Sequence, residues 1–205
     1  MKIVIFGATG RTGSDIVRLA LADGHEVKAF ARTPDKVTPH LNLAVVQGDV
    51  RDAQAVKEAI EGADAVVSAL GTDGTTTLTE AMSSIIEGMI AYSVSRIVTI
   101  GTAGILESRT EPSKLRYQSN ESHRKLTFAA EEHHKVFDML SSSSLEWTIV
   151  CPTYLPGGEA TGNYRIERDR LPIEGKQIST GDTAAFAYGE LLRKQHVGYR
   201  VGISD

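Results

Sequence analysis

Gly7-Ala8-Thr9-Gly10-Arg11-Thr12-Gly13 follows a short apolar run that ends at Phe6, and a helical pattern of apolar residues begins within it. Residues 1–6 are too few for a helix, include β-branched side chains and stop at a glycine, which predicts a first strand. Three glycines at this spacing, between a strand and a helix, are typical of a turn that holds a dinucleotide. The first glycine permits a tight bend, the second lets the backbone approach a pyrophosphate, and the third lets the helix pack on the strand.

Apolar segments and helical patterns continue to alternate along the chain. We expect further strands at residues 27–30, 43–47, 65–70, 96–100, 146–150 and 199–201, helices at 12–22, 52–60, 78–92, 115–140 and 181–193, and a short hairpin at 164–178. Strands that alternate with helices favour a parallel sheet with right-handed crossovers. We therefore predict an α/β fold, a Rossmann-type doubly wound parallel sheet, in a single domain over residues 1–205. Residues 152–178 are expected to form a small C-terminal segment of loop and hairpin that covers the substrate site.

Composition and charge restrict the class of protein. The 205 residues are 41% hydrophobic and 23% charged, and the net charge is −4. Without a long apolar or basic run, neither a membrane nor a nucleic acid is an expected partner. The sole cysteine, Cys151, excludes an intramolecular disulfide and suits the cytoplasm. His133 and His134 are adjacent and point to different faces of a helix, so no metal site is expected. We expect a small-molecule substrate, and a monomer or a weak homo-oligomer.

The end of the second strand is where a fold of this type contacts the adenosine ribose. Proteins that bind NAD usually have Asp or Glu there, whereas this chain has Arg32, with Lys36 four residues later. A guanidinium can bind the 2′-phosphate of NADP(H) through two hydrogen bonds, and Arg11 can add to the same site. The pattern favours NADP(H) as the cofactor; solvated surface cations are the alternative interpretation.

Other strand ends are also expected to contact the cofactor. Asp49 and Val50 follow the third strand, where the Asp49 carboxylate can accept a hydrogen bond from the adenine amine. Asp49 can equally cap the helix that starts near Asp52. Residues 69–71 end the fourth strand, where the chain must pass close to the cofactor ribose and phosphates.

The reaction centre is expected beyond the carboxyl ends of strands four to six. Short-chain dehydrogenases share this glycine turn, and they use a tyrosine with a lysine four residues later on one helix face. None of the six tyrosines of this chain has a lysine at that spacing. Ordinary alcohol–ketone chemistry is therefore not favoured.

The chain resembles the flavin reductase/biliverdin-IXβ reductase family, which are NmrA-like atypical short-chain dehydrogenases that lack the Tyr-Lys pair. The matching stretches span nearly the whole chain in order: residues 5–13, 32 with 36, 48–50, 70–72, 134–136, 161–164 and 178–182. The resemblance implies that His134 lies near the cofactor and that Thr102 replaces a serine beside the nicotinamide. It also puts Tyr154 where the family has a histidine.

Thr102 and Tyr154 are accordingly the predicted catalytic residues. By resemblance, Thr102 would hold the nicotinamide amide or the acceptor, and Tyr154 would stack on the acceptor or donate a hydrogen bond. A hydroxyl that only caps the strand end is the alternative for Thr102. An aromatic wall without a chemical role is the alternative for Tyr154.

The function implied by the resemblance is an NADPH-dependent reductase of a flat conjugated acceptor, such as a flavin (FMN, FAD or riboflavin) or biliverdin. Orientation and the exclusion of water would be the main contributions of the protein. The alternative is a non-catalytic NmrA-like protein that senses NADP(H); a nucleotide-sugar epimerase is a third hypothesis. The predicted cofactor contacts are Gly7, Thr9, Gly10, Arg11, Thr12, Gly13, Arg32, Lys36, Asp49, Val50, Ala69, Leu70, Gly71, Gly101, His134, Pro152 and Thr153.

Overall fold

The computed structural model describes residues 1–122 and 126–205, except for the side chain of Lys36. In chain order the strands and α-helices are β1 (Lys2–Phe6), α1 (Arg11–Ala22), β2 (Glu26–Ala31), β3 (Leu43–Gln47), α2 (Ala53–Ile60), β4 (Ala65–Ser68), α3 (Thr77–Ala91), β5 (Arg96–Ile100), α4 (Phe128–Ser141), β6 (Glu146–Pro152), β7 (Arg165–Arg168), α5 (Thr180–Arg193) and β8 (Tyr199–Ser204). They form one α/β domain around an 8-stranded sheet with the order β3-β2-β1-β4-β5-β6-β8-β7. Neighbouring strands are parallel except β7, which runs antiparallel to β8.

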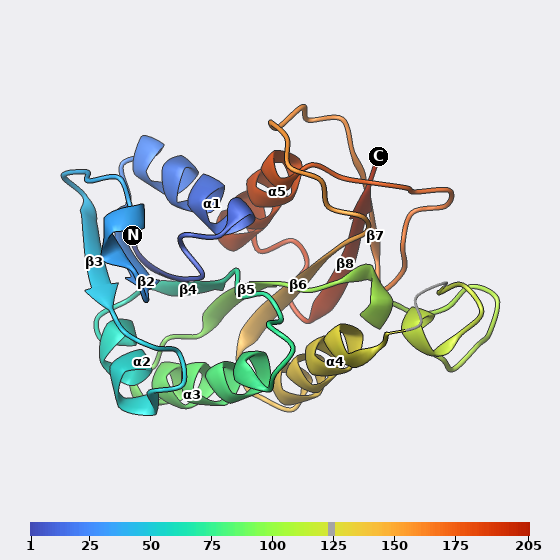
Figure 1. Ribbon diagram of the computed structural model, residues 1–205, viewed down its shortest axis with the longest axis horizontal. Helices are drawn as coiled ribbons and strands as arrows, with labels where there is room; N and C mark the ends of the chain where they lie inside the picture. The colour runs from blue at the N-terminus through green and yellow to red at the C-terminus, as the bar shows by residue number, and fades with distance from the viewer. Residues whose placement is uncertain (123–125) are drawn as a thin grey trace.

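Helices cover both faces of this sheet (Figure 1). α1 and α5 pack on one face, and α2, α3 and α4 pack on the other. Val66 belongs to the core beneath α2–α4, and its neighbour Val67 belongs to the core beneath α1 and α5. A strand covered on both faces is apolar throughout, which explains the continuous apolar run of β4. Within residues 1–122 and 126–205, no helix is both long and apolar enough to cross a membrane.

The strand order reverses beside β1, which has β2 on one side and β4 on the other. The chain first builds outward to β3 and then returns to build in the opposite direction, as the doubly wound prediction requires. In such a sheet the connections after β1 and β4 leave in opposite directions, so a crevice opens at the carboxyl ends of these strands. The fold therefore puts the expected binding region at this edge, which we call the carboxyl edge.

The long helix expected at residues 115–140 is wrong in its first half. α4 begins at Phe128, and the chain before it forms a loop with a 3-10 turn. The Arg116 amide donates to the Leu106 carbonyl at 2.8 Å, so this loop bonds to the segment after β5 instead of continuing a helix. Part of the prediction falls on residues 123–125, which lie outside the described residues.

The hairpin expected at residues 164–178 is also wrong. β7 pairs with β8 and not with the residues that follow it, while Gln177 forms an isolated bridge with Tyr154. β8 pairs with β6 on one side, and residues 165–168 pair with its other side. The fourth strand stops at Ser68, earlier than expected, and residues 69–71 leave the sheet at its carboxyl edge.

Candidate functional site

The glycine turn between β1 and α1 is tightly packed. Gly7 has a φ of +77°, and a Cβ on it would lie 2.5 Å from the Ala69 carbonyl oxygen. A Cβ on Gly13 would lie 2.0 Å from the Gly7 carbonyl oxygen, so a side chain there would push α1 away from β1. The Gly10 amide closes the turn by donating to the Gly7 carbonyl at 3.0 Å. The first amides of α1 are thereby brought to the carboxyl edge, where a helix N-terminus favours an anion.

A cavity of about 230 Å³ lies at the carboxyl ends of β1–β4, and we call it the dinucleotide cavity. It collects predicted cofactor contacts that come from four separate segments of the chain. These are Gly7, Thr9, Gly10, Arg32, Asp49, Val50, Ala69, Leu70 and Gly71. A dinucleotide fits this cradle, because glycine backbone forms the wall beside α1 while a guanidinium and a carboxylate lie on the rim.

The predicted phosphate-binding cation Arg32 lies just beyond the end of β2. Its side chain is exposed and lines the dinucleotide cavity, at the position where a ribose is expected. Lys36 ends a 3-10 turn at Pro34–Lys36, and its side chain lies outside the described part of the structure. Of these two cations, Arg32 is therefore the one whose substitution can test the preference for NADP(H).

The two roles considered for Asp49 are separated by the structure. Asp52 caps α2, since its carboxylate accepts from the amides of Gln54 at 3.0 Å and Ala55 at 3.2 Å. Asp49 instead accepts from the Arg51 amide at 2.9 Å and lines the dinucleotide cavity. Asp49 is thus fixed by a local turn and remains a candidate adenine contact.

Sequence reasoning missed two charged residues of the dinucleotide cavity, Arg51 and Asp73. Arg51 donates to the Thr75 hydroxyl at 2.6 Å, which connects the loop after β3 to the loop after β4. Hydrogen bonds from Thr75 and Thr77 lower the pKa of Asp73 to about 2. No local sequence pattern marks Arg51 and Asp73, because their place in the cavity depends on the contact between the loop after β3 and the loop after β4.

A second cavity of about 290 Å³ lies beyond the carboxyl ends of β5 and β6, and we call it the acceptor cavity. Thr102 follows β5 and Tyr154 follows β6, and both line this cavity. Pro152 and Thr153, which were predicted as cofactor contacts, line it as well. The structure therefore brings the two predicted catalytic residues to one site.

Thr102 and Tyr154 present different groups to the acceptor cavity. The Thr102 hydroxyl accepts from the Gly104 amide at 3.4 Å, so the backbone-capping role considered for it is present in the structure. Tyr154 is 62% exposed, and its backbone carbonyl accepts from the Ile178 amide at 2.9 Å. Thr102 is held by its own loop, whereas the ring of Tyr154 is open to solvent and to a ligand.

Among the described residues, five predicted cofactor contacts line neither cavity: Arg11, Thr12, Gly13, Gly101 and His134. Arg11 donates to the Leu155 carbonyl at 3.2 Å, and Thr12 is buried in the first turn of α1. A Cβ on Gly101 would lie 2.6 Å from a methyl carbon of Ile149, so this glycine serves the packing of β5 on β6. His134 contacts Tyr117: its Nδ1 lies 3.0 Å from the phenol oxygen.

Sequence reasoning also missed Tyr117 and Ala130, which line the acceptor cavity. A Cβ on Gly104 would lie 3.1 Å from the Ala130 Cβ and 3.5 Å from the Tyr117 Cβ, so α4 and the loop before it close tightly on the end of β5. The error in the start of α4 concealed this arrangement, because a helix through residue 117 would place the tyrosine elsewhere.

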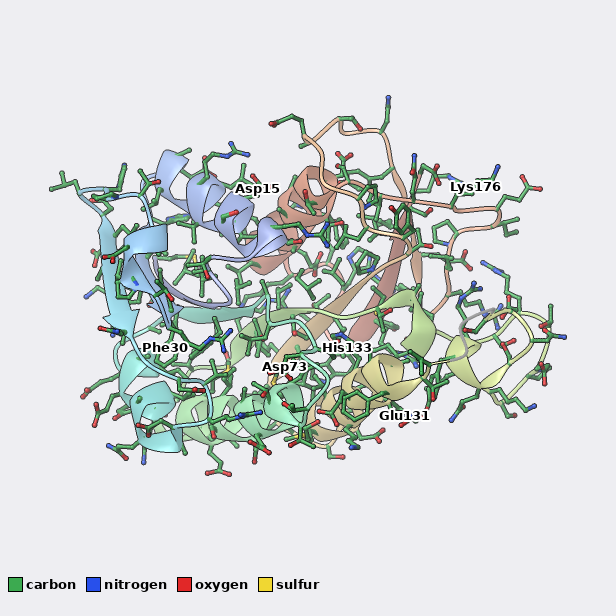
Figure 2. The ribbon with its side chains drawn as sticks, in the orientation of Figure 1. Asp15, Phe30, Asp73, Glu131, His133 and Lys176 are labelled. Atoms are coloured by element: carbon green, nitrogen blue, oxygen red, sulfur yellow. The ribbon has the colours of Figure 1, made fainter. Side chains whose placement is uncertain are left out.

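His133 in α4 and Cys151 in β6 are two further titratable groups, and both are buried. His133 faces the sheet from α4, whereas Glu131 lies on the opposite side of that helix (Figure 2). Burial lowers the pKa of His133 to about 4, against the opposing charge of Glu132. Burial raises the pKa of the Cys151 thiol to about 12, so a neutral thiol packs in the core at the end of β6. Among the described residues, His, Cys, Asp and Glu form no group of three or more that could hold a metal ion.

Comparison with known proteins identifies the family to which the chain belongs. The model of the NAD(P)H-binding family matches residues 7–194, from the glycine turn to the end of α5. This chain belongs to the NAD(P)H-binding family. Its relative YwnB from Bacillus subtilis, an uncharacterized protein, is 31% identical over an alignment of 210 positions that covers 98% of this chain and 96% of YwnB.

Solved structures resemble the NAD(P)H-binding chain along its whole length. A candidate epimerase from Bacteroides thetaiotaomicron is 29% identical with a TM-score of 0.86, and the match covers 99% of this chain and 96% of that one. A candidate NADH-flavin reductase from Streptococcus pneumoniae is 25% identical with a TM-score of 0.85, over 100% and 99% of the two chains. These findings confirm the Rossmann-type fold, the family resemblance and a nicotinamide dinucleotide as the cofactor class. The chain has the fold of an NAD(P)H-binding oxidoreductase.

Proposed function

We propose that this protein is an NADPH-dependent reductase of a flat conjugated acceptor, such as a flavin or a bilin. The observation that carries the proposal is the alignment of two cavities along one edge of the sheet. The dinucleotide cavity spans the ends of β1–β4, and the acceptor cavity follows at the ends of β5 and β6. A dinucleotide that begins at β2 and extends toward β5 brings its nicotinamide to the entrance of the acceptor cavity.

The preference for NADPH rests on Arg32. This guanidinium lies on the rim of the dinucleotide cavity at the end of β2, where an NAD-binding protein usually has a carboxylate. A planar guanidinium suits the 2′-phosphate, with which it forms charge-assisted hydrogen bonds. The candidate NADH-flavin reductase carries the other coenzyme in its name, so the choice between NADH and NADPH needs a direct measurement.

The chemistry proposed for the site relies on orientation. Bound NADPH supplies a hydride to the acceptor, and this chain needs to hold the acceptor flat against the nicotinamide and exclude water. Tyr154 has the exposed ring that can stack on such an acceptor, and Thr102 has a hydroxyl fixed at the end of β5. Residues 152–154 line the acceptor cavity, and we propose that the segment 152–178 forms its outer wall.

The test is a steady-state screen of NADPH oxidation by the purified full chain with riboflavin, FMN, FAD, biliverdin and quinones. We expect loss of the NADPH absorbance band with at least one flat acceptor, and a slower rate with NADH. Tyr154→Leu removes the stacking surface and should raise KM for the acceptor. Tyr199→Phe, at the start of β8, should leave both KM and kcat unchanged. Tight NADPH binding without turnover of any acceptor would reject the reductase and favour a sensor of NADP(H).

A further inference from the structure

Tyr117 lines the acceptor cavity, and its phenol oxygen lies between two side chains on the protein side. Gln118 Nε2 is 3.1 Å from this oxygen, and His134 Nδ1 is 3.0 Å from it. The Tyr117 Cβ lies 3.5 Å from the position of a Cβ on Gly104, in the loop after β5 that also carries Thr102. Tyr117 is therefore part of the wall of the cavity in which we expect the acceptor.

The direction of the Gln118 hydrogen bond follows from a second contact. Gln118 Oε1 accepts from the Leu115 backbone amide at 3.1 Å, which fixes the orientation of the side-chain amide. Its NH₂ group has no acceptor capacity, so it must donate to the Tyr117 oxygen. One of the lone pairs of the phenol oxygen is thus occupied by a donor.

His134 connects the phenol to the surface. Its Nε2 lies 3.7 Å from Asp138 Oδ1, one turn further along α4. The His134 side chain is 29% exposed and that of Asp138 is 64% exposed, so water reaches this end of the arrangement. The side chains of Tyr117, His134 and Asp138 lie in a row from the acceptor cavity to solvent, and the step from His134 to Asp138 is longer than a hydrogen bond.

The proposed reaction needs a source of protons, because a hydride alone turns a neutral acceptor into an anion. Reduction of a flavin adds a hydride at N5 and leaves negative charge at N1 and its neighbours until a proton arrives. A positioned acid that supplies this proton typically accelerates a reaction by about 10²–10⁴-fold.

We propose, on the basis of the proposed reductase function, that Tyr117 is the catalytic acid that gives this proton to the acceptor. With Nδ1–H of His134 and the Gln118 amide both donating to the phenol oxygen, the phenol hydrogen is directed to the acceptor. The acceptor gains a hydride at one atom, and NADPH is oxidised to NADP⁺. The O–H bond of Tyr117 breaks as the acceptor gains a proton at a second atom. The phenolate then takes the Nδ1 proton of His134, and Nε2 takes a proton from water, which leaves a hydroxide that the buffer neutralises. Exchange of the ring protons with solvent returns His134 to the form with its proton on Nδ1.

The other hydroxyls of the acceptor cavity are less suited to this role. The Thr102 hydroxyl is an alcohol, a far weaker acid than a phenol, whose pKa is about 10 in model peptides. It also accepts from the Gly104 amide, which fixes it in its own loop. Tyr154 is exposed to solvent, where water can give and take protons without a relay.

Two acceptors that differ in charge test the proposal. Riboflavin is neutral and becomes an anion on receiving a hydride, whereas the cationic dye methylene blue becomes neutral and needs no proton. In Tyr117→Phe we expect kcat with riboflavin to fall on the order of 100-fold, while kcat with methylene blue stays unchanged. Tyr199→Phe, which loses a hydroxyl at the start of β8 instead, should match the wild type with both acceptors.

The outcomes separate this proposal from the reductase function. A wild type that oxidises NADPH with neither acceptor rejects the reductase, and the acid falls with it. A wild type that is active, with a Tyr117→Phe variant that loses nothing or loses both activities equally, rejects the acid alone. NADPH affinity and thermal unfolding of the variant, measured in parallel, show whether the fold and the cofactor site are intact.

A measurement without turnover tests the hydrogen-bond direction. The ¹⁵N shifts of labelled histidine report which ring nitrogen carries the proton, and the signals missing in His134→Gln identify this residue. We expect neutral His134 to carry its proton on Nδ1 in the wild type. A proton on Nε2 would make Nδ1 the acceptor of the phenol hydrogen, and the relay would then be wrong.

Discussion

At the amino ends of the strands, which we call the amino edge, a buried guanidinium is surrounded by oxygen atoms. At the carboxyl edge, by contrast, glycines leave the backbone exposed to the cavities. Arg96, the first residue of β5, donates to the carbonyl of Glu146 and the hydroxyl of Thr148 at 2.8 and 2.9 Å. It also donates to the carbonyl of Glu190 at 2.8 Å and pairs with the Glu190 carboxylate at 3.3 Å. Both side chains are fully buried.

The pairing at the amino edge extends to the connection between α5 and β8. The Glu190 carboxylate accepts from the His196 backbone amide at 2.7 Å, and His196 Nδ1 lies 2.9 Å from its second oxygen. In the part of the chain that the structure describes, Arg96 Nε is the one atom of this cluster that is buried without a partner. The amino edge thus attaches α5 to β5 and β6, and its polar groups are almost all engaged within the protein.

This difference between the two edges indicates which end of the sheet can bind a ligand. The two edges lie at opposite ends of the same strands, so they share a core but hardly any polar contacts. Polar groups at the carboxyl edge, such as Arg32 and Asp49, line cavities and remain available to a ligand. A substitution at one edge should therefore leave the property carried by the other edge unchanged. The first two of the four predictions that follow test this separation, and the last two test buried titratable groups.

Arg96→Ala should give the largest effect. It leaves the Glu190 carboxylate buried without its guanidinium, and breaking a buried pair from one side costs about 3–5 kcal/mol. Urea unfolding measures the loss, and NADPH affinity should be unchanged where the variant is still folded. Arg18→Ala, which removes an exposed cation from a pair with Asp15, is the matched control and should cost less than about 1 kcal/mol. A small loss for Arg96→Ala would contradict the structural role of the amino edge.

Arg32→Ala should act in the opposite way, on binding and not on stability. Loss of a charge-assisted contact to the 2′-phosphate should weaken NADPH binding by about 1.5–3 kcal/mol and leave NADH binding almost unchanged. Calorimetry with both coenzymes measures the difference. An equal loss for NADPH and NADH would show that Arg32 does not contact the 2′-phosphate.

His133 should make the protein less stable as the pH falls. Its pKa in the folded state is lowered to about 4 by burial, below the value of about 6.5 in an unfolded chain. Between these values the unfolded state binds one more proton, so stability decreases as the pH falls. His133→Leu should remove on the order of 2 kcal/mol of this decrease between pH 6.5 and 4.5. Urea unfolding across this range measures it, and exposed His40→Gln should retain the wild-type slope.

Asp182→Asn should give a smaller effect, in a more acidic range. Burial opposes ionisation of Asp182, but hydrogen bonds from Gly162, Ser179 and Thr161 outweigh it and lower the pKa. A carboxyl with a lowered pKa stabilises the fold above its unfolded pKa of about 3.9, and this stabilisation is lost as the pH falls through the folded pKa. The variant should be less stable by about 1–2 kcal/mol at neutral pH. The gap to the wild type should close below about pH 4, and a gap that persists in acid would contradict the assignment.

The sequence was sufficient where the structural signal lies within a few neighbouring residues. The glycine turn contains much of its own requirement, since a Cβ on Gly13 would meet the Gly7 carbonyl oxygen within the first crossover. β4 is apolar on both faces, so its run of residues predicts a central parallel strand. These local patterns predicted the fold class, the positions of the first six strands along the chain and most of the residues that line the dinucleotide cavity.

The sequence was insufficient where a residue depends on a distant partner. Arg96 and Glu190 are 94 positions apart, and neither stands in a pattern that marks a buried pair. β7 is a strand because β8 is beside it, and Tyr117 lines a cavity because its loop bonds to Leu106. Short polar segments of this kind have weak preferences of their own, so tertiary contacts decide their structure.

The position of β8 between β6 and β7 has a consequence for the order in which the protein is assembled during synthesis. The ribosome completes β1–β6, with the whole dinucleotide cavity, before β8 exists, and nascent chains fold from their N-terminal parts first. β7 emerges earlier than β8, the strand with which it pairs, so the segment after β6 has to wait without its final partner. The newly made protein should therefore be able to bind its coenzyme before the wall of its acceptor cavity is complete.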